Sequence, residues 1–269
     1  MKKFLCFFGI FALIAGFVTS CGDDDDDDEG NGSNGGSNSV VQKKLAKVVV
    51  DGYDSYEFKY DNDGKCTSFL DLENNQLIET TNFKYEGNKI VEECCLLDGT
   101  VRVTTTIILN SKGYVESVTT VNGGSETTMY EYDNQGRLIS ESYTDEDGES
   151  VVKTYTWENG NISKVDVHEK DGDNDFRHSL YIGYTNSAYP NGIENKAGIN
   201  YTQFDDEFVS PYYKVAGVAL EKLPLTVKYS IDEGSAVQTI TWTLDSDGYP
   251  IRSVSDYGSD KDTFEFVWE

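Results

Sequence analysis

From residue 45 onward the chain alternates apolar and polar residues in short runs, each followed by a turn rich in Asp, Asn and Gly. Alternation of this kind gives a β-strand one buried and one solvated face. Clear examples are Tyr130-Glu131-Tyr132 and the TYTW run at 154–157. The runs contain Val, Ile, Thr, Tyr, Phe and Trp, which favour strands, and the turn residues tolerate positive φ or hydrogen-bond to their own backbone. The pattern predicts an all-β protein built of hairpins.

The hairpins repeat with a nearly constant spacing. Five turn glycines are separated by 23, 26, 23 and 24 residues, and they are Gly64, Gly87, Gly113, Gly136 and Gly160. Further turns between them bring the spacing to about 12 residues, which predicts an up-and-down antiparallel meander of repeated hairpins. We expect a curved or wrapped sheet, and an open sheet, a closed barrel and a sandwich all fit this spacing. Because the turn recurs, its polar residues are interpreted as scaffold.

One stretch, residues 186–224, breaks the pattern and contains three of the four prolines. Within it, Ser210 can cap a helix and Pro211 can open one. We therefore expect one short helix at about 211–222, packed on the sheet, in the C-terminal third of the chain. Residues 43–269 are then a single β-hairpin-repeat domain with one irregular insert.

The first 20 residues hold two lysines, a long apolar run and no acidic residue. A charged start followed by an apolar stretch too short for a spanning helix is typical of a signal peptide. The run ends in Val18-Thr19-Ser20-Cys21, which resembles the bacterial lipobox. That resemblance implies cleavage after residue 20 and lipidation of Cys21, where several acyl chains give a stable anchor to the outer membrane. A secreted protein without lipid is the alternative.

Residues 21–42 follow as an acidic run and a Gly, Ser and Asn-rich stretch. A segment of this composition cannot bury apolar surface, so we expect a disordered tether. The acidic run at 23–29, directly after the cysteine, resembles the surface-export signal of Bacteroidota lipoproteins. It implies presentation on the outside of the outer membrane, and a solvating spacer is the alternative.

Charge excludes one class of partner. Without Lys2 and Lys3 the chain has 20 basic and 48 acidic residues, a net charge of −28. Such a surface repels phosphate backbones, so we expect no nucleic-acid partner.

Three cysteines remain in the mature domain, Cys66, Cys94 and Cys95. No CxxC pair or histidine cluster accompanies them, so a zinc site is not expected. Either Cys66 forms one disulfide with Cys94 or Cys95 after export, or the thiols are free and buried.

The repeated turn also carries a resemblance. Residues 132–138 read YDNQGRL and resemble the YD repeat of Rhs-type proteins, whereas 109–110 and 244–245 replace Tyr-Asp by Leu-Asn and Leu-Asp. Together with the lipobox and the acidic run, the chain resembles an uncharacterised family of Bacteroidota surface lipoproteins with YD-like hairpin repeats. These have a short helix before a Leu-Pro element, here at 223–224, and an aromatic last strand. The resemblance implies a fold and a location, and no activity.

Metal binding has one candidate run, Asp171, Asp173 and Asp175. Carboxylates two residues apart resemble oxygen-rich calcium loops, but an EF-hand also needs a distant bidentate Glu, which is absent here. Hairpin turns also use Asp and Gly, and this explanation accounts for all the Asp- and Gly-rich turns of the repeat. We expect no bound cofactor.

Catalysis has no recognisable motif. His168 and His178 are the only histidines, and neither belongs to a G-x-S-x-G or H-E-x-x-H arrangement. We name no catalytic residue and expect a non-enzymatic protein.

Sugar binding has one supporting feature, the 18 Tyr, 13 Phe and 3 Trp of the chain. Aromatics also form cores and cross-strand pairs, so most are expected to be structural. Candidate ligand-binding residues gather in the irregular insert, where loops on a repeat scaffold commonly carry function. They are Tyr189, Tyr201, Tyr212 and Tyr213, and Tyr181 and Tyr184 directly before the insert are further candidates. The sequence thus predicts a surface-anchored lipoprotein that is a non-enzymatic binding or structural module with a glycan or protein ligand. An accessory glycan-binding protein of an outer-membrane uptake system is the alternative.

Overall fold

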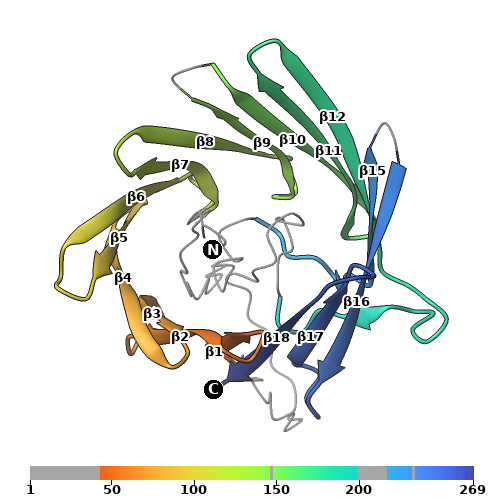
Figure 1. Ribbon diagram of the computed structural model, residues 1–269, viewed down its shortest axis with the longest axis horizontal. Helices are drawn as coiled ribbons and strands as arrows, with labels where there is room; N and C mark the ends of the chain where they lie inside the picture. The colour runs from red at the N-terminus through yellow and green to blue at the C-terminus, as the bar shows by residue number, and fades with distance from the viewer. Residues whose placement is uncertain (1–42, 146–147, 199–216, 232–233) are drawn as a thin grey trace, which may run out of the picture.

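The computed structural model of the chain describes residues 43–145, 148–198, 217–231 and 234–269 (Figure 1). The predicted signal peptide, Cys21 and the predicted tether lie outside the described residues. The first strands are β1 (Leu45–Val50), β2 (Asp54–Tyr60), β3 (Cys66–Glu73), β4 (Gln76–Glu86), β5 (Lys89–Leu96), β6 (Val101–Leu109), β7 (Val115–Val121), β8 (Ser125–Tyr132) and β9 (Leu138–Thr144). The others are β10 (Ser150–Glu158), β11 (Asn161–Asp171), β12 (Asn174–Gly183), β13 (Ile193–Glu194), β14 (Lys222–Leu223), β15 (Thr226–Ile231), β16 (Gly234–Leu244), β17 (Pro250–Asp256) and β18 (Lys261–Trp268).

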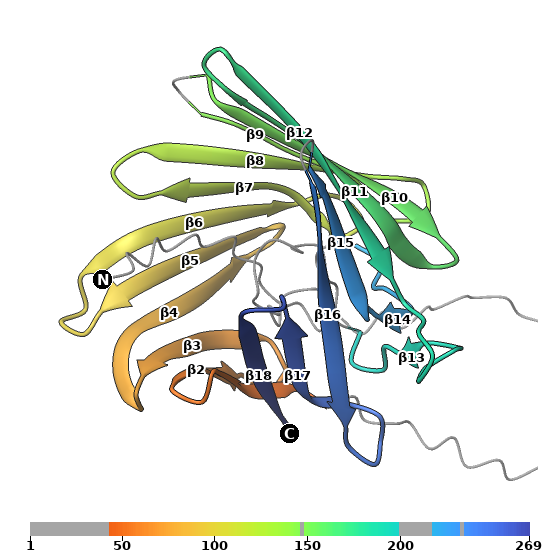
Figure 2. The same cartoon turned by 45° about the vertical axis from the view of Figure 1, so that its right-hand side comes forward.

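Sixteen of the described strands form one closed antiparallel barrel, and β13 and β14 form a separate two-stranded sheet. Barrel strands pair with their neighbours in the sequence, except that β12 pairs with β15 across the insert and β1 pairs with the last strand, β18. Figure 1 looks into the resulting ring, and Figure 2 shows the hairpins running side by side around it. The antiparallel meander is confirmed, and the wrapped sheet takes the form of a closed barrel.

Asp133 shows how the repeated turn works. Its Oδ1 accepts hydrogen bonds from the backbone N–H groups of Gln135 (2.9 Å) and Arg137 (3.0 Å). Gly136, with a φ of 81°, donates its N–H to the carbonyl oxygen of Asp133, a conformation that glycine adopts without steric cost. The same pair of bonds, from the residues two and four places on, is made by Asp61, Asn110 and Asp245. The polar residues of the repeat therefore build turns, as their recurrence predicts.

Aromatic residues near the strand ends join neighbouring segments through hydrogen bonds that we call the aromatic bridges. The Tyr85 hydroxyl donates to the carbonyl oxygen of Cys66 at 2.7 Å, and the Trp157 indole N–H donates to that of Leu138 at 2.7 Å. The other bridges are Tyr60 to Leu45, Tyr184 to Ile162, Trp242 to Pro224 and Trp268 to Pro250. All six accepting residues are buried, so each bridge satisfies a carbonyl that water does not reach.

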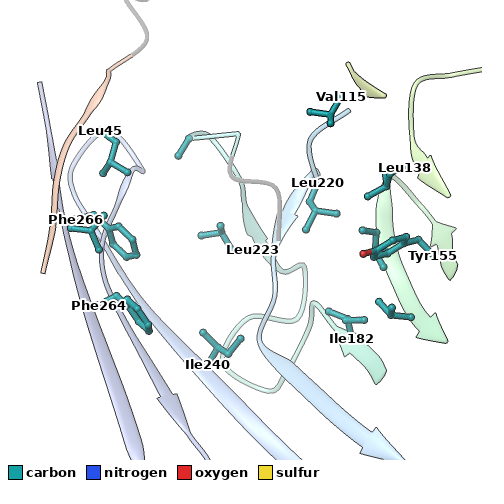
Figure 3. Packing of buried hydrophobic residues seen from close by; sticks show 14 of the residues in the cluster. Leu45, Val115, Leu138, Tyr155, Ile182, Leu220, Leu223, Ile240, Phe264 and Phe266 are labelled. Atoms are coloured by element: carbon teal, nitrogen blue, oxygen red, sulfur yellow. The ribbon is translucent and has the colours of Figure 1, made fainter. Parts of the chain in front are cut away.

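The described part of the insert packs against the end of the barrel that carries the Gly136 and Gly160 turns, which we call the turn end. The Val218 N–H donates to the carbonyl oxygen of Gly136 at 2.8 Å, and the Glu221 N–H donates to that of Gly160 at 3.1 Å. Leu220 and Leu223 are buried, and Figure 3 shows them between opposite walls of the barrel. One wall carries Leu45, Phe264 and Phe266, and the other carries Leu138, Tyr155 and Ile182. The insert thus fills part of the apolar interior.

The helix expected at about 211–222 is wrong for the part that the structure describes. Residues 211–216 lie outside the described residues, and the stretch from Gly217 to Glu221 is not helical before Lys222 begins β14. Gly217 has a φ of 91°, which a right-handed helix does not allow. For the described residues, burial of Leu220 in the barrel interior outweighs the weak local preference for a helix. Among the described residues there is no helix of the length and apolar character needed to cross a membrane.

The three cysteines of the domain are free in the structure, in keeping with the second of the two alternatives. Cys66 and Cys94 are buried on the inner face, where the Cys94 thiol donates to Glu79 Oε2 at 3.1 Å. Cys95 follows on β5 and is only partly buried.

Removing one aromatic bridge tests its contribution. We expect Tyr85→Phe to lower the free energy of unfolding by about 1 kcal/mol, because the Cys66 carbonyl loses its partner while the ring stays in place. Tyr53→Phe is the control, since Tyr53 is exposed. Urea denaturation measures both variants, and equal midpoints for the two would contradict a role for the bridge.

The contact between the insert and the turns can be tested at Gly217. A Cβ atom there would lie 2.5 Å from the Gly136 carbonyl oxygen and 2.8 Å from the Tyr132 ring. Gly258 has a similar φ, 93° against 91°, with no atom within 4 Å of the same Cβ. We expect Gly258→Ala to cost about 1–2 kcal/mol for the left-handed backbone. Gly217→Ala should cost about 1–3 kcal/mol more, because it adds a clash. Equal losses in thermal denaturation would show that the contact is not tight.

Candidate ligand-binding site

The barrel wall has an apolar inner face and a polar outer face. Fully buried residues such as Val48, Ile107 and Leu180 line the inside. On the outside, cross-strand neighbours form ion pairs and hydroxyl contacts. Examples are Lys47 with Glu57 (2.9 Å), Lys84 with Glu93 (2.8 Å) and Thr119 with Thr127 (2.9 Å). The outer face thus carries ion pairs and hydroxyl groups, and it also exposes single apolar side chains such as Met129, Val237 and Val267.

A depression lies on this outer face across β10, β11, β12 and β15, which run side by side in Figures 1 and 2. Its volume is about 640 Å³. Residues directly opposite one another on antiparallel strands share a face, so the outward side chains fall into rows. The rows are Thr154–Asp166–Ser179–Ser230 and Val152–His168–Arg177, and the lining also includes Val167 and His178. We call this feature the outer depression.

Asp166 is the centre of the first row. Its Oδ1 accepts a hydrogen bond from the Ser179 hydroxyl at 2.6 Å and lies 2.7 Å from Lys164 Nζ. Partial burial acts to raise the pKa of Asp166, but the hydrogen bonds from Lys164 and Ser179 outweigh it and hold the pKa below its usual value. Asp166 is therefore an ionised acceptor at neutral pH.

In the second row, His168 and Arg177 contact each other and also Asp175, which is the next outward residue on β12. His168 Nε2 lies 3.0 Å from Asp175 Oδ1 and 3.1 Å from Arg177 Nη2. The Arg177 Nε–H donates to the same Asp175 oxygen at 3.1 Å. The hydrogen bond from His168, joined by that from Arg177, lowers the pKa of Asp175 below its usual value. Asp175 is thus an ionised acceptor tied to two cationic or polar donors.

A third outward row, beyond Asp166, places an aromatic ring next to the depression but outside its lining. Tyr181 is 45% exposed and lies opposite Lys164, whose Nζ is 5.6 Å from the centre of the ring. The cation holds the ring in a defined position. The outer depression therefore contains paired donors and acceptors, and an exposed aromatic ring lies beside it.

The candidate calcium ligands do not meet. Asp171 ends β11, Asp173 lies in the following turn and Asp175 is on β12, where it faces His168 and Arg177. Within the described ranges, no three His, Cys, Asp or Glu residues are placed to hold a metal ion together. The described residues therefore offer no ligand cluster that would support calcium binding.

Of the candidate tyrosines in the insert, the structure describes Tyr189 alone. It is 40% exposed in a turn of the insert, where its N–H donates to Asn186 Oδ1 at 2.8 Å. Tyr201, Tyr212 and Tyr213 lie outside the described residues, as does Cys21, so these assignments stay predictions.

The outer depression was not predicted from the sequence. Its rows depend on the register between β10, β11, β12 and β15, and β12 reaches β15 only across the insert. Strand alternation could have placed Asp166, His168 and Ser179 outward, but it does not say which strands adjoin.

A second polar group lies on the inner face, over β3 to β6. Glu79 Oε2 lies 2.6 Å from Arg102 Nη2, and Asp71 lies opposite Glu79. Burial, joined by the negative charge of Glu79, raises the pKa of Asp71 to about 6. Glu92 is 1% exposed and neither carboxyl oxygen has a hydrogen-bond partner, so burial raises its pKa well above the usual value. Burial therefore favours the protonated form of Glu92 in the folded protein.

Comparisons with known proteins concern the fold. Neither a protein-family model nor a curated protein matches the chain. A porin-like protein from Bacteroides uniformis ATCC 8492 has a similar structure, with a TM-score of 0.61 and 18% sequence identity. The match covers 84% of this chain and 98% of that one. At this identity the two proteins share a fold, and the comparison says nothing of a shared activity.

The buried Glu92 makes stability depend on pH. The unfolded carboxyl ionises near its ordinary pKa of 4.5, whereas the folded one stays protonated, so stability is lost as the pH rises above that value. We expect Glu92→Gln to be more stable than the native chain at pH 8, with the difference shrinking toward pH 4. Glu93→Gln, at the adjacent outward position paired with Lys84, should show no such gain. Thermal denaturation at both pH values measures this, and a pH-independent difference would contradict it.

Proposed function

We propose that this protein is a lipoprotein of the outer membrane of a Bacteroidota cell, anchored through Cys21 and facing the exterior. Its barrel stands in water and acts as a non-enzymatic binding or structural module. The observation that carries the proposal is the polarity of the barrel wall. Ion pairs such as Lys47–Glu57 and Lys84–Glu93 lie outside, and the apolar residues lie inside.

This polarity is the reverse of that in a membrane-spanning barrel. Spanning barrels have an apolar outer band, aromatic girdles and a polar lumen, and a Lys or Arg on the lipid face near the midplane costs about 2–4 kcal/mol. Here the outer face carries Lys47, Lys84, Lys164 and Arg177. The interior is apolar at the turn end and is occupied by Leu220 and Leu223 of the insert. A pore function is therefore not part of the proposal.

The anchor and the charge fit a barrel held near a membrane surface but not in it. A flexible chain of the length of residues 22–42 has a root-mean-square span of roughly 25 Å. The net charge of −28 for the chain without Lys2 and Lys3 repels anionic headgroups and nucleic acid alike. The partner of the anchor is the outer membrane, and the ligand of the domain is a glycan or a protein.

The ionisable groups support a non-enzymatic module. His168 Nε2 contacts Asp175 and Arg177, so the histidine takes part in an ion-pair cluster on the outer face. Burial raises the pKa of the Cys66 thiol to about 12 and that of the Cys94 thiol to about 11, so both stay protonated at neutral pH. Protonated thiols are poor nucleophiles, which leaves these groups with structural roles.

Removing the lipid separates an anchored barrel from a spanning one. In one variant, residues 1–21 are replaced by a secretory signal peptide that is cleaved completely. We expect this variant to fractionate as a soluble protein without detergent, because its outer face is polar. The full chain should stay with the outer membrane and take up labelled palmitate, and Cys21→Ala should abolish the labelling. A lipid-free barrel that remains in washed membranes would contradict the proposal.

Orientation is measured on the same cells by protease treatment without lysis. We expect the barrel of the full chain to be released or degraded. A variant with the acids of 23–29 changed to Asn and Gln should stay membrane-bound and become protected. Complete protection of the native chain would rule out an exterior location.

A further inference from the structure

We propose that the outer depression binds a neutral saccharide. The inference rests on the proposed function in one respect, since it requires the outer face of β10, β11, β12 and β15 to be in contact with water. It names the ligand class of the module and places the site on the barrel wall. The candidate tyrosines at 201, 212 and 213 lie outside the described residues and are not part of this proposal.

The hydrogen-bonding groups of the depression suit hydroxyl groups. A sugar hydroxyl donates one hydrogen bond and accepts others, so it needs donors and acceptors side by side. The first row supplies both, with the Asp166 carboxylate between the hydroxyl groups of Thr154 and Ser179. Arg177 adds a guanidinium whose side chain is 69% exposed. A ligand with adjacent hydroxyl groups can contact carboxylate, hydroxyl and guanidinium at once.

The balance of charge favours a neutral ligand over an anionic one. Lys164 is paired with Asp166 at 2.7 Å, and Arg177 is paired with Asp175 at 3.1 Å. Each cation is therefore already neutralised by a carboxylate, and these carboxylates would repel a phosphate or uronate group. The acidic character of the whole chain adds to that repulsion.

Two apolar surfaces flank the polar row. Tyr181 lies on one side of it, and Val152, 36% exposed, lies in the row on the other side. The faces of sugar rings carry C–H groups that pack on aromatic and aliphatic side chains, while the ring edges carry the hydroxyl groups. Along the strands, the polar Asp166 row lies between the apolar side chains of Val152 and Tyr181. This order matches a sugar ring, whose polar edges adjoin apolar faces.

The size of the depression is that of a ligand site. Its volume of about 640 Å³ lies inside the range of about 300–1,000 Å³ that ligand pockets span. Its walls are four strands of one continuous sheet, and side chains held on strands keep their spacing better than those on loops.

The test uses the full lipoprotein, purified in detergent, on an array of neutral oligosaccharides (glucans, mannans, galactans and xylans) with uronic-acid oligosaccharides beside them. We expect binding to at least one neutral oligosaccharide, followed by calorimetry with that compound. Asp166→Asn and Tyr181→Ala should each weaken its affinity at least tenfold. Asp256→Asn is the matched control, since Asp256 forms a similar outward ion pair with Lys261 at 2.6 Å, and Tyr53→Ala is the control for an exposed ring. Both controls should bind as the native chain does.

Three results would overturn the proposal. They are no binding to any sugar, binding to uronic-acid compounds alone, and binding that Tyr189→Ala abolishes while Asp166→Asn leaves it unchanged. Thermal denaturation of each variant checks that the barrel is intact. The proposed location is tested separately by fractionation and protease treatment, so a failure of the sugar site leaves that result untouched.

Discussion

The aromatic bridges set the arrangement of the hairpins, because they connect side chains of one unit to buried carbonyl groups of another. Tyr85 and Trp157 each reach back to the first residue of an earlier strand, and Trp268 does so at the last strand. Tyr60 makes the same contact beside β1, next to the closing pair of β1 and β18. Closure leaves the sheet without an unpaired edge, which removes the main route by which strands aggregate.

A barrel of this size must be filled by something other than its own wall. Eight strands enclose a space that side chains fill, whereas sixteen leave an interior too wide for them. Here the inner face is apolar, so an interior left to water would expose the core. The insert fills the interior at the turn end, where Leu220 and Leu223 lie between opposite walls. There the Val218 N–H donates a hydrogen bond to the Gly136 carbonyl. The hairpin repeat thus forms the wall of the barrel, and the insert that interrupts it fills part of the interior.

With the apolar residues turned inward, the outer face is free to carry function. It presents ladders of ion pairs and hydroxyl groups, and one region gathers Asp166, Ser179, His168 and Arg177 around a depression. The similarity to a porin-like protein is a similarity of fold, a closed antiparallel meander. The distribution of polar and apolar residues over the two faces is a property of this chain. That distribution, rather than the shape of the barrel, directs the functional proposal toward a water-facing module.

The amino-acid sequence by itself determined the strands, the turns and their spacing, because alternation and Asp-x-x-Gly chemistry act over a few residues: Asp133 and Gly136 form their turn from local bonds alone. It also predicts a signal peptide and a lipid anchor at Cys21. Only the tertiary structure decided that the sheet closes, that the stretch from Gly217 runs inside the barrel without forming a helix, and that the rows of the outer depression adjoin. Closure and the junction of β12 with β15 depend on register between segments far apart in the chain, and neighbouring residues hold no information on it.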